Sequence, residues 1–197
     1  MRDERLCKQL TFVIEIDRLK DVLRQTYLMN GTRRENDAEH SWHISLMAVL
    51  LSEYADDEEI DILRVVRMLL VHDLVEIDAG DTFAYDEVGY RDKAQRENAA
   101  AERIFALLPG DQAGEFRGLW EEFEARKSPD ARFAAAMDLL QPVLHNYETK
   151  GVTWKKYGIT LPQVMRRIAP IREGSEALWE YASTLVDDAV GRGYLDG

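Results

Sequence analysis

The sequence predicts an all-α protein folded as a single domain, and three observations support this. Long stretches place apolar residues three or four positions apart, the spacing of a helix with one buried face. No stretch alternates convincingly with the two-residue period of a strand, and proline is scarce, at 5 of 197 residues. No repeat or flexible linker divides the chain, so we expect one helical bundle over residues 1–197.

The first half of the chain predicts helices at about residues 3–27, 38–54 and 58–74. The first carries an apolar face and stops at Asn30-Gly31, because that pair favours a turn. A polar loop follows, and either Asn36 or Asp37 caps the second helix. The third helix is strongly apolar towards its end.

The second half begins with an irregular acidic segment at residues 78–90, and long irregular segments beside reactive residues are often functional. After Ser128 a helix starts with Pro129 in its first turn, a favoured arrangement for a helix N-terminus. The helices expected here lie at about 91–108, 112–126, 129–147, from 161 onward, and 175–190.

Composition and charge narrow the functional classes. The net charge of −12 argues against a nucleic-acid polymer as a partner, because binding a phosphate backbone requires a basic surface. No apolar run approaches the roughly 18 residues of a membrane helix, and the charged start of the chain does not resemble a secretion leader. Cys7 is the single cysteine and cannot form an internal disulfide, so we expect a cytoplasmic protein without membrane contact.

Four polar residues stand within the apolar faces of these helices. His72 and Asp73 are adjacent where a run of leucines and valines ends, His40 opens the second helix, and Asp138 lies within a late helix. Burying such groups is costly unless they are paired or bound to a metal ion. Two histidines and two carboxylates would leave about two octahedral positions of a divalent cation open, which is a catalytic arrangement.

Each of these residues has a structural alternative. A lone histidine on an apolar helix face is commonly a hydrogen-bonded core residue, and Asp138 could cap a neighbouring helix or pair with an arginine. His43 shares a helix face with His40 and is either such a core residue or a partner of His40. His145 either faces the same site or is structural. The ordered set of four is a stronger signal than any single member.

The order of histidine, histidine-aspartate and aspartate on helices resembles the HD-domain superfamily of metal-dependent phosphohydrolases. The segments 34–41 and 72–76, followed by Gly80-Asp81, are similar to those of the bacterial 5′-deoxynucleotidases and of the eukaryotic HD-domain-containing protein 2 relatives. The resemblance covers a metal-site core at about 10–147 and extends towards C-terminal helices at about 160–192. It implies an HD-type helical bundle and a homodimer, because members of the family are commonly dimers.

The resemblance also implies a cofactor and its ligands. A divalent metal cation would be held by His40, His72, Asp73 and Asp138. Mixed nitrogen and oxygen ligands are compatible with Mn, Co, Fe, Ni, Zn or Mg, so the identity of the metal stays open.

The resemblance further implies catalytic and substrate-binding residues. Glu76 would orient or deprotonate the attacking water or protonate the leaving group, a role that suits a carboxylate beside a metal ion. Asp81 would lie near the sugar and the nucleophile, and Arg24 would bind the phosphate. Because the segment between Arg24 and His40 is one residue longer than in the bacterial branch, Arg33 or Arg34 is an alternative phosphate ligand. In that branch a tryptophan follows the arginine, and here Gln25 takes its place. The choice between a deoxyribose and a ribose substrate therefore stays open.

These features lead us to expect a metal-dependent phosphomonoesterase acting on a small nucleotide, the 5′-monophosphate of a (deoxy)nucleoside. One alternative keeps the fold and the site but cleaves the diphosphate or phosphodiester bond of another nucleotide. A second alternative, from a different class, is a non-catalytic helical binding protein with a degenerate metal site. The complete set of four candidate ligands, with Glu76 and Asp81, weighs against decay.

Overall fold

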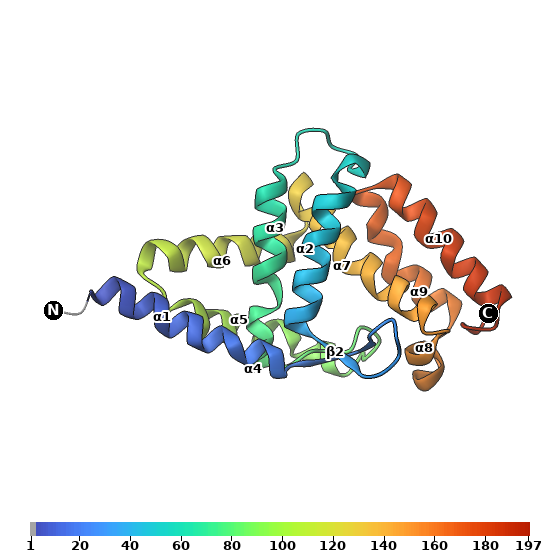
Figure 1. The fold of residues 1–197 in the computed structure, drawn as a ribbon, viewed down its shortest axis with the longest axis horizontal. Helices are drawn as coiled ribbons and strands as arrows, with labels where there is room; N and C mark the ends of the chain where they lie inside the picture. The colour runs from blue at the N-terminus through green and yellow to red at the C-terminus, as the bar shows by residue number, and fades with distance from the viewer. Residues whose placement is uncertain (1–2) are drawn as a thin grey trace.

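The computed structural model describes residues 3–197, so the first two residues of the expected domain lie outside it. Over this range the protein is α-helical apart from one short hairpin, which confirms the expected fold class (Figure 1). The elements are α1 (Glu4–Ile16), β1 (Leu23–Tyr27), β2 (Arg34–Asn36), α2 (Asp37–Leu51), α3 (Ile62–Val71), α4 (Glu76–Ala79), α5 (Lys93–Phe105), α6 (Gly110–Ala125), α7 (Pro129–Glu148), α8 (Val152–Tyr157), α9 (Leu161–Ile168) and α10 (Glu176–Gly191). Short 3₁₀ turns join several of them, including η1 (Asp17–Asp21), η3 (His72–Val75) and η5 (Ala169–Glu173).

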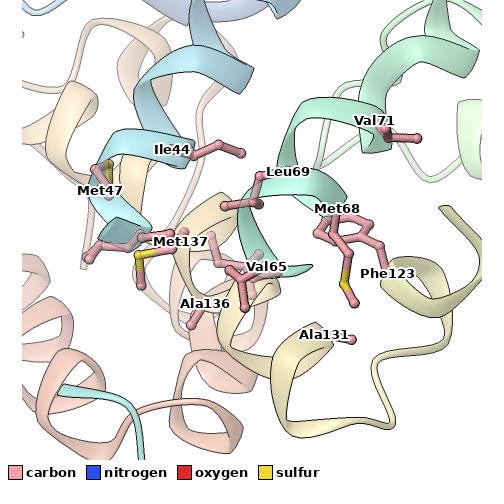
Figure 2. Close-up of a cluster of buried hydrophobic side chains, with 14 of the residues drawn as sticks. Ile44, Met47, Val65, Met68, Leu69, Val71, Phe123, Ala131, Ala136 and Met137 are labelled. Atoms are coloured by element: carbon pink, nitrogen blue, oxygen red, sulfur yellow. The ribbon is translucent and has the colours of Figure 1, made fainter. Parts of the chain in front are cut away.

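The long helix α7 is the element around which the others pack (Figure 1). α2 and α3 lie side by side and both contact α7, which also contacts α6, α9, α10 and η5. Figure 2 shows part of the core where α2, α3 and α7 meet. Its fully buried members include Ile44, Val65, Met68, Leu69 and Met137. Burying an aliphatic side chain of this size contributes roughly 1.5–3 kcal/mol, so this contact fixes the three helices relative to one another.

The expected helix at residues 3–27 is wrong in its second half. α1 ends at Ile16, and after η1 the chain forms β1, which pairs antiparallel with β2. The guanidinium of Arg34 stabilises this hairpin, because its Nη2 donates to the carbonyl of Leu23 at 2.6 Å and its Nε to the carbonyl of Arg24. The side chain of Arg34 thus donates to carbonyl groups that, in a helix, would accept hydrogen bonds from backbone N–H groups of the same segment.

The apolar face expected for the first helix exists, but most of it is exposed. Phe12 is the one buried residue of α1. The exposed members of the face are Leu6, Leu10, Val13 and Ile14. Periodicity predicted which residues share a face and could not predict whether another part of the same chain covers that face.

The second helix is capped as expected, by the first of the two candidates. The side chain of Asn36 accepts from the backbone N–H of Glu39 at 2.9 Å, and the Glu39 carboxylate accepts from the N–H of Asn36 at 3.3 Å. This reciprocal capping box satisfies two N–H groups that would otherwise lack partners. Asp37 is therefore not the cap and is the first residue of α2.

Two further boundaries differ from expectation. α3 begins at Ile62 rather than near residue 58, because the side chain of Asp61 caps the N–H groups of Leu63 and Arg64. α8, which the sequence did not predict, follows Gly151. Among residues 3–197, no helix combines the length and the apolar character needed to cross a bilayer.

The C-terminal segment packs closely against the start of α8. Gly151 has a φ of 76°, and a Cβ atom there would lie 1.8 Å from the carbonyl oxygen of Tyr194. The carbonyl of Asp196 accepts from the N–H of Leu161 at 2.8 Å. α8 and α9 are thus held in place by the end of the chain.

Candidate metal centre and active site

Four residues from distant parts of the sequence meet at one buried centre. α2 carries His40, η3 carries His72 and Asp73, and α7 carries Asp138. His40 Nε2 lies 3.2 Å from an oxygen of Asp138 and 4.0 Å from an oxygen of Asp73. His72 Nε2 lies 3.0 Å from the other oxygen of Asp73. His40, His72 and Asp73 can therefore offer ligand atoms to a single ion, and Asp138 lies beside His40.

The local backbone sets the direction of the His72 and Asp73 side chains. The α-helix α3 tightens into the 3₁₀ turn η3 at His72, and such changes of helix type often mark functional sites. His72 Nδ1 donates to the carbonyl of Leu69 at 2.8 Å, which directs Nε2 at the centre. A backbone carbonyl that holds the far nitrogen of a histidine is the usual way to orient a metal ligand.

The donor set fits a divalent cation. Single ligand atoms of His40, His72 and Asp73 lie within 4.8 Å of one another, and so do those of Asp37, Asp73 and Glu76. Within the described part of the chain, His72 Nε2, both oxygens of Asp37 and one oxygen of Glu76 are buried without a hydrogen-bond partner. Buried polar atoms without partners are costly, and a cation would satisfy several of them at once. The site can therefore hold a divalent metal, whose identity stays unspecified.

Charges at the centre act strongly on one another. Burial opposes both charges of the adjacent pair, yet their mutual attraction raises the pKa of His72 to about 9 and lowers the pKa of Asp73 to about 2. Burial, assisted by the charge of Arg24, lowers the pKa of His40 to about 4. His40 is thus a neutral imidazole at pH 7, which is the form that binds metals.

Of the three candidate phosphate ligands, Arg24 lies at the centre. Its Nη1 is 3.0 Å from Asp73 and 3.5 Å from Asp37, and its Nη2 is 4.0 Å from Asp138. Burial opposes its charge, but these carboxylates raise the pKa of Arg24 above its ordinary value.

The other two arginines lie elsewhere. Arg33 forms an ion pair with Glu39 on the surface, and Arg34 is occupied by the carbonyl groups of β1. The hairpin, which the sequence did not predict, is what separates the three.

Glu76 and Asp81 line the same cavity as His72, Asp73 and Asp138, a space of about 210 Å³. Burial, together with the charges of Asp73 and Asp37, raises the pKa of Glu76 well above its ordinary value. Burial also raises the pKa of Asp81, although Arg24 opposes the shift. A carboxyl group that keeps its proton near neutral pH is suited to protonate a leaving oxygen.

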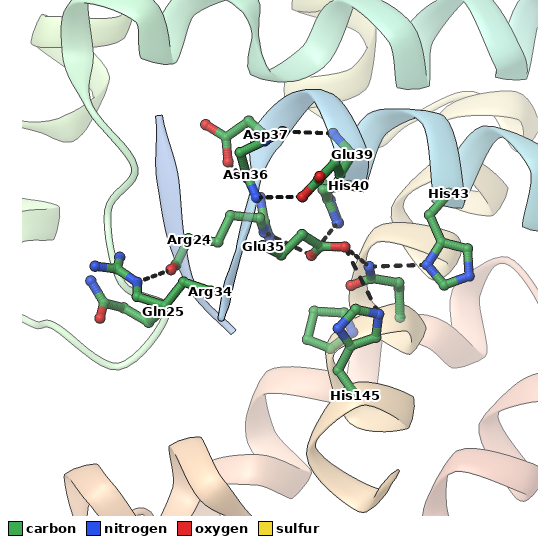
Figure 3. A network of polar contacts seen from close by, with 12 residues as sticks. Arg24, Gln25, Arg34, Glu35, Asn36, Asp37, Glu39, His40, His43 and His145 are labelled. Atoms are coloured by element: carbon green, nitrogen blue, oxygen red, sulfur yellow. Dashed lines mark hydrogen bonds and ion pairs between the residues drawn. The ribbon is translucent and has the colours of Figure 1, made fainter. Parts of the chain in front are cut away.

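Sequence reasoning missed Glu35, which lies directly behind His40 (Figure 3). An oxygen of Glu35 is 3.7 Å from His40 Nδ1, and its other oxygen accepts from Gln141 Nε2 at 2.7 Å. Gln141 Nε2 also lies 3.3 Å from His43 Nδ1, and His145 Nε2 is 3.8 Å from Glu35. His43 and His145 therefore belong to a layer behind His40, not to the cavity.

Asp37 is the second residue that was missed as a member of the site. The sequence predicts it only as a candidate cap, yet it is fully buried beside Arg24, and burial and the charge of Asp73 raise its pKa to about 7. Neither Glu35 nor Asp37 interrupts an apolar run, so the contrast that revealed the other four residues was absent. The segment that contains Glu35 and Asp37 is polar throughout, so its pattern does not single out either residue.

Comparison with known proteins identifies the family of this chain. The HD domain family matches residues 16–179. The human protein named 5′-deoxynucleotidase HDDC2 is 31% identical over 147 residues, which cover 74% of this chain and 70% of the relative. The Schizosaccharomyces pombe protein named 5′-deoxynucleotidase hdd1 is 25% identical over 190 residues, which cover 87% of this chain and 94% of the relative.

Solved structures extend the comparison to three dimensions. A crystal structure described as a predicted metal-dependent phosphohydrolase from Magnetospirillum magnetotacticum MS-1 has a TM-score of 0.95 at 59% identity, covering 98% of this chain and 96% of that one. A conserved hypothetical protein from Pyrococcus furiosus has a TM-score of 0.64 at 19% identity, covering 91% and 98%, and is similar in fold alone. The resemblance found in the sequence is confirmed, and this chain belongs to the HD domain family of metal-dependent phosphohydrolases.

Proposed function

We propose that this protein is a metal-dependent 5′-nucleotidase that hydrolyses (deoxy)nucleoside 5′-monophosphates to nucleoside and phosphate. The observation that carries the proposal is the guanidinium of Arg24, whose side chain is 13% exposed and whose Nη1 lies 3.0 Å from Asp73 beside the candidate metal centre. A fork of N–H donors beside a cation site is suited to bind the oxygens of a phosphate group. The names of the human and S. pombe relatives support the class of substrate.

In this proposal His40, His72, Asp73 and Asp138 hold the metal. When bound, a divalent cation supplies Lewis-acid chemistry, which neutralises phosphate charge and makes water a better nucleophile. We assign the remaining roles to side chains that line the cavity. The burial of all four ligands supports a rigid site with little reorganisation on binding.

The proposed hydrolysis transfers the phosphoryl group from the 5′ oxygen of the nucleoside to water. Arg24 binds the non-bridging oxygens and offsets their charge, while the bond from phosphorus to the 5′ oxygen breaks. Glu76 gives its proton to that leaving oxygen and regains one from the attacking water, and Asp81 orients the sugar and the water. The raised pKa of Glu76 supports its role as the acid.

Phosphate release from a panel of nucleotides, with and without added Mn²⁺ or Co²⁺, tests the proposal. We expect activity on nucleoside 5′-monophosphates, loss of activity with a chelator, and recovery when the metal is restored. His72→Ala and Asp73→Ala should each abolish turnover while the circular dichroism spectrum stays helical. Near-full turnover by metal-replete His72→Ala protein would overturn the mechanism. Product analysis that finds hydrolysis of di- or cyclic nucleotides alone would redirect the proposal to another bond.

We also propose that the protein is a homodimer joined through the exposed apolar face of α2. Its members follow the spacing of one helix face, and each is more than 40% exposed: Trp42, Leu46, Val49 and Leu50. Contiguous exposed apolar side chains of this kind mark protein–protein interfaces. Leu50→Glu should shift the sedimentation coefficient from dimer to monomer, whereas Tyr181→Glu, an exposed position on α10, should leave it unchanged. A wild-type monomer at micromolar concentration would contradict this proposal.

A further inference from the structure

The cavity extends from the candidate metal centre along one face of α7. Asp138 lines its inner end, and the residues that follow along the wall are Leu139, Pro142, Val143 and Asn146. Asp138 and Asn146 are eight positions apart, or about 12 Å along a helix that rises 1.5 Å per residue. This length leaves room for more than a phosphate group.

Aromatic side chains form the facing walls of this outer part. Trp154 of α8 lines the cavity, together with Phe83 and Tyr85 from the irregular segment after α4. The ring centroids of Phe83 and Tyr85 are 5.3 Å apart, and Phe83 lies 4.6 Å from Tyr157 of α8. Ligand pockets with apolar and aromatic walls and a few polar groups suit flat organic ligands.

The first of two polar groups in this part is the amide of Asn146, which is 5% exposed. Its Nδ2 donates to the carbonyl of Pro142 at 2.9 Å. Because a carbonyl can only accept, this bond fixes the orientation of the amide and leaves Oδ1 as a free acceptor. Oδ1 is buried and has no hydrogen-bond partner among residues 3–197.

The second polar group is the guanidinium of Arg167 on α9. Arg167 lines the cavity and is half-buried, and it forms no hydrogen bond or ion pair with the rest of the described chain. Its charge acts on Tyr85, where it opposes the rise in the phenol pKa that burial causes. The cation that acts most strongly on Asp81 is instead Arg24. Arg167 therefore serves the aromatic end of the cavity and Arg24 the metal end.

We propose that the aromatic end is a nucleobase subsite that prefers 6-oxopurines, an inference that rests on the proposed function. Arg167 donates its fork of N–H groups to O6 and N7 of guanine or hypoxanthine, which are adjacent acceptors. Adenine presents a donor beside N7 and cannot match that fork. Asn146 Oδ1 accepts from an N–H of the base. Both unpartnered groups gain hydrogen bonds in this way.

The ratio of kcat/KM for dGMP to that for dAMP tests the subsite. We expect the wild-type holoenzyme to favour dGMP by about tenfold, within the range that a bidentate arginine contact supplies. Arg167→Met should bring the ratio close to one, with the loss falling on dGMP. Arg166→Met is the matched control, because Arg166 is an exposed neighbour on the same helix with the same charge, and it should preserve the ratio.

Two further measurements keep the outcome interpretable. Phenyl phosphate carries no base, so its hydrolysis should be equal in wild-type and Arg167→Met protein; unequal rates would mean that Arg167 supports the metal end instead. A wild-type ratio near one, or a preference that survives Arg167→Met, overturns the subsite and leaves the 5′-nucleotidase proposal standing. If no nucleoside monophosphate is hydrolysed, the proposed function itself fails, and calorimetric binding of dGMP against dAMP then decides the subsite.

Discussion

Glu35 illustrates how a residue outside the cavity can act on the metal centre. Its carboxylate lies 3.7 Å from His40 Nδ1, on the side of the ring opposite the centre, and Gln141 holds it from behind. Within residues 3–197 this carboxylate oxygen and His40 Nδ1 are both buried without a hydrogen-bond partner. A carboxylate that binds the far nitrogen of a metal-bound histidine fixes which nitrogen carries the proton and makes the other a stronger ligand. We therefore predict that Glu35 positions His40 when a metal ion is bound, without touching the substrate.

Glu35→Gln should weaken metal affinity by about 10- to 100-fold, the usual effect of losing such a partner. Calorimetric titration of metal-free protein with Mn²⁺ or Co²⁺ measures the change. Glu53→Gln, at an exposed position, is the control and should bind as the wild type does. If the metal affinity of Glu35→Gln protein is within twofold of wild type, Glu35 does not influence His40 as a metal ligand.

The sequence pattern alone singled out four polar residues in apolar helix faces, His40, His72, Asp73 and Asp138, whereas the resemblance supplied Arg24, Glu76 and Asp81. The structure brings the four close to one another, and their role as metal ligands stays a prediction. The choice of Arg24 over its two competitors could not be made from the sequence, because it depends on a hairpin whose pairing is set by contacts across the turn.

At the level of elements, the fold class and most helices followed from periodicity, while connections did not. The hairpin, the late start of α3 and the presence of α8 each depend on side-chain caps or on a distant segment. The backbone at Gly151 is the clearest case, because the close approach of the Tyr194 carbonyl cannot be inferred from local residues.

Gly151→Ala should destabilise the protein more than Gly158→Ala. Both glycines have a left-handed backbone, at φ of 76° and 60°, so each substitution costs about 1–2 kcal/mol in backbone strain. At Gly151 the new methyl group would also collide with the Tyr194 carbonyl, whereas no atom lies within 4 Å at Gly158. Urea denaturation measures both free energies of unfolding. Equal losses of unfolding free energy would show that the C-terminal segment moves away from the new methyl group without destabilising the protein.

For the whole molecule, we propose that residues 1–197 form one cooperative domain. α7 contributes Phe133 and Met137 to the buried core and also contacts α9, α10 and η5, so the metal-site core and the C-terminal helices share one hydrophobic interior. Chemical denaturation followed by tryptophan fluorescence and by helicity should give coincident transitions. Two separate transitions would divide the chain into independent units.

Metal binding should stabilise the whole molecule, because the ligands meet only in the folded state. A free metal concentration 100 times the Kd should add about 2.7 kcal/mol, which corresponds to roughly 5–10 °C in Tm for a chain of this size. Differential scanning calorimetry of wild-type and Asp138→Ala protein, with and without Co²⁺, measures the shift. The same increase in the Asp138→Ala protein would place the stabilising ion elsewhere.

The 3₁₀ turn η3 gives the chain an unusual sensitivity to length. It carries His72 and Asp73 and leads directly into Glu76, so one backbone segment aims three groups of the site. One inserted or deleted residue would rotate everything beyond it by about 100–120°, since a helical turn holds 3.0–3.6 residues. A library of insertions, deletions and substitutions over residues 71–76, scored by phosphate release, should therefore lose activity with every change of length while apolar replacements at Leu74 and Val75 survive. Variation in this stretch is expected to proceed by exchange of side chains and not by growth or shortening of the chain.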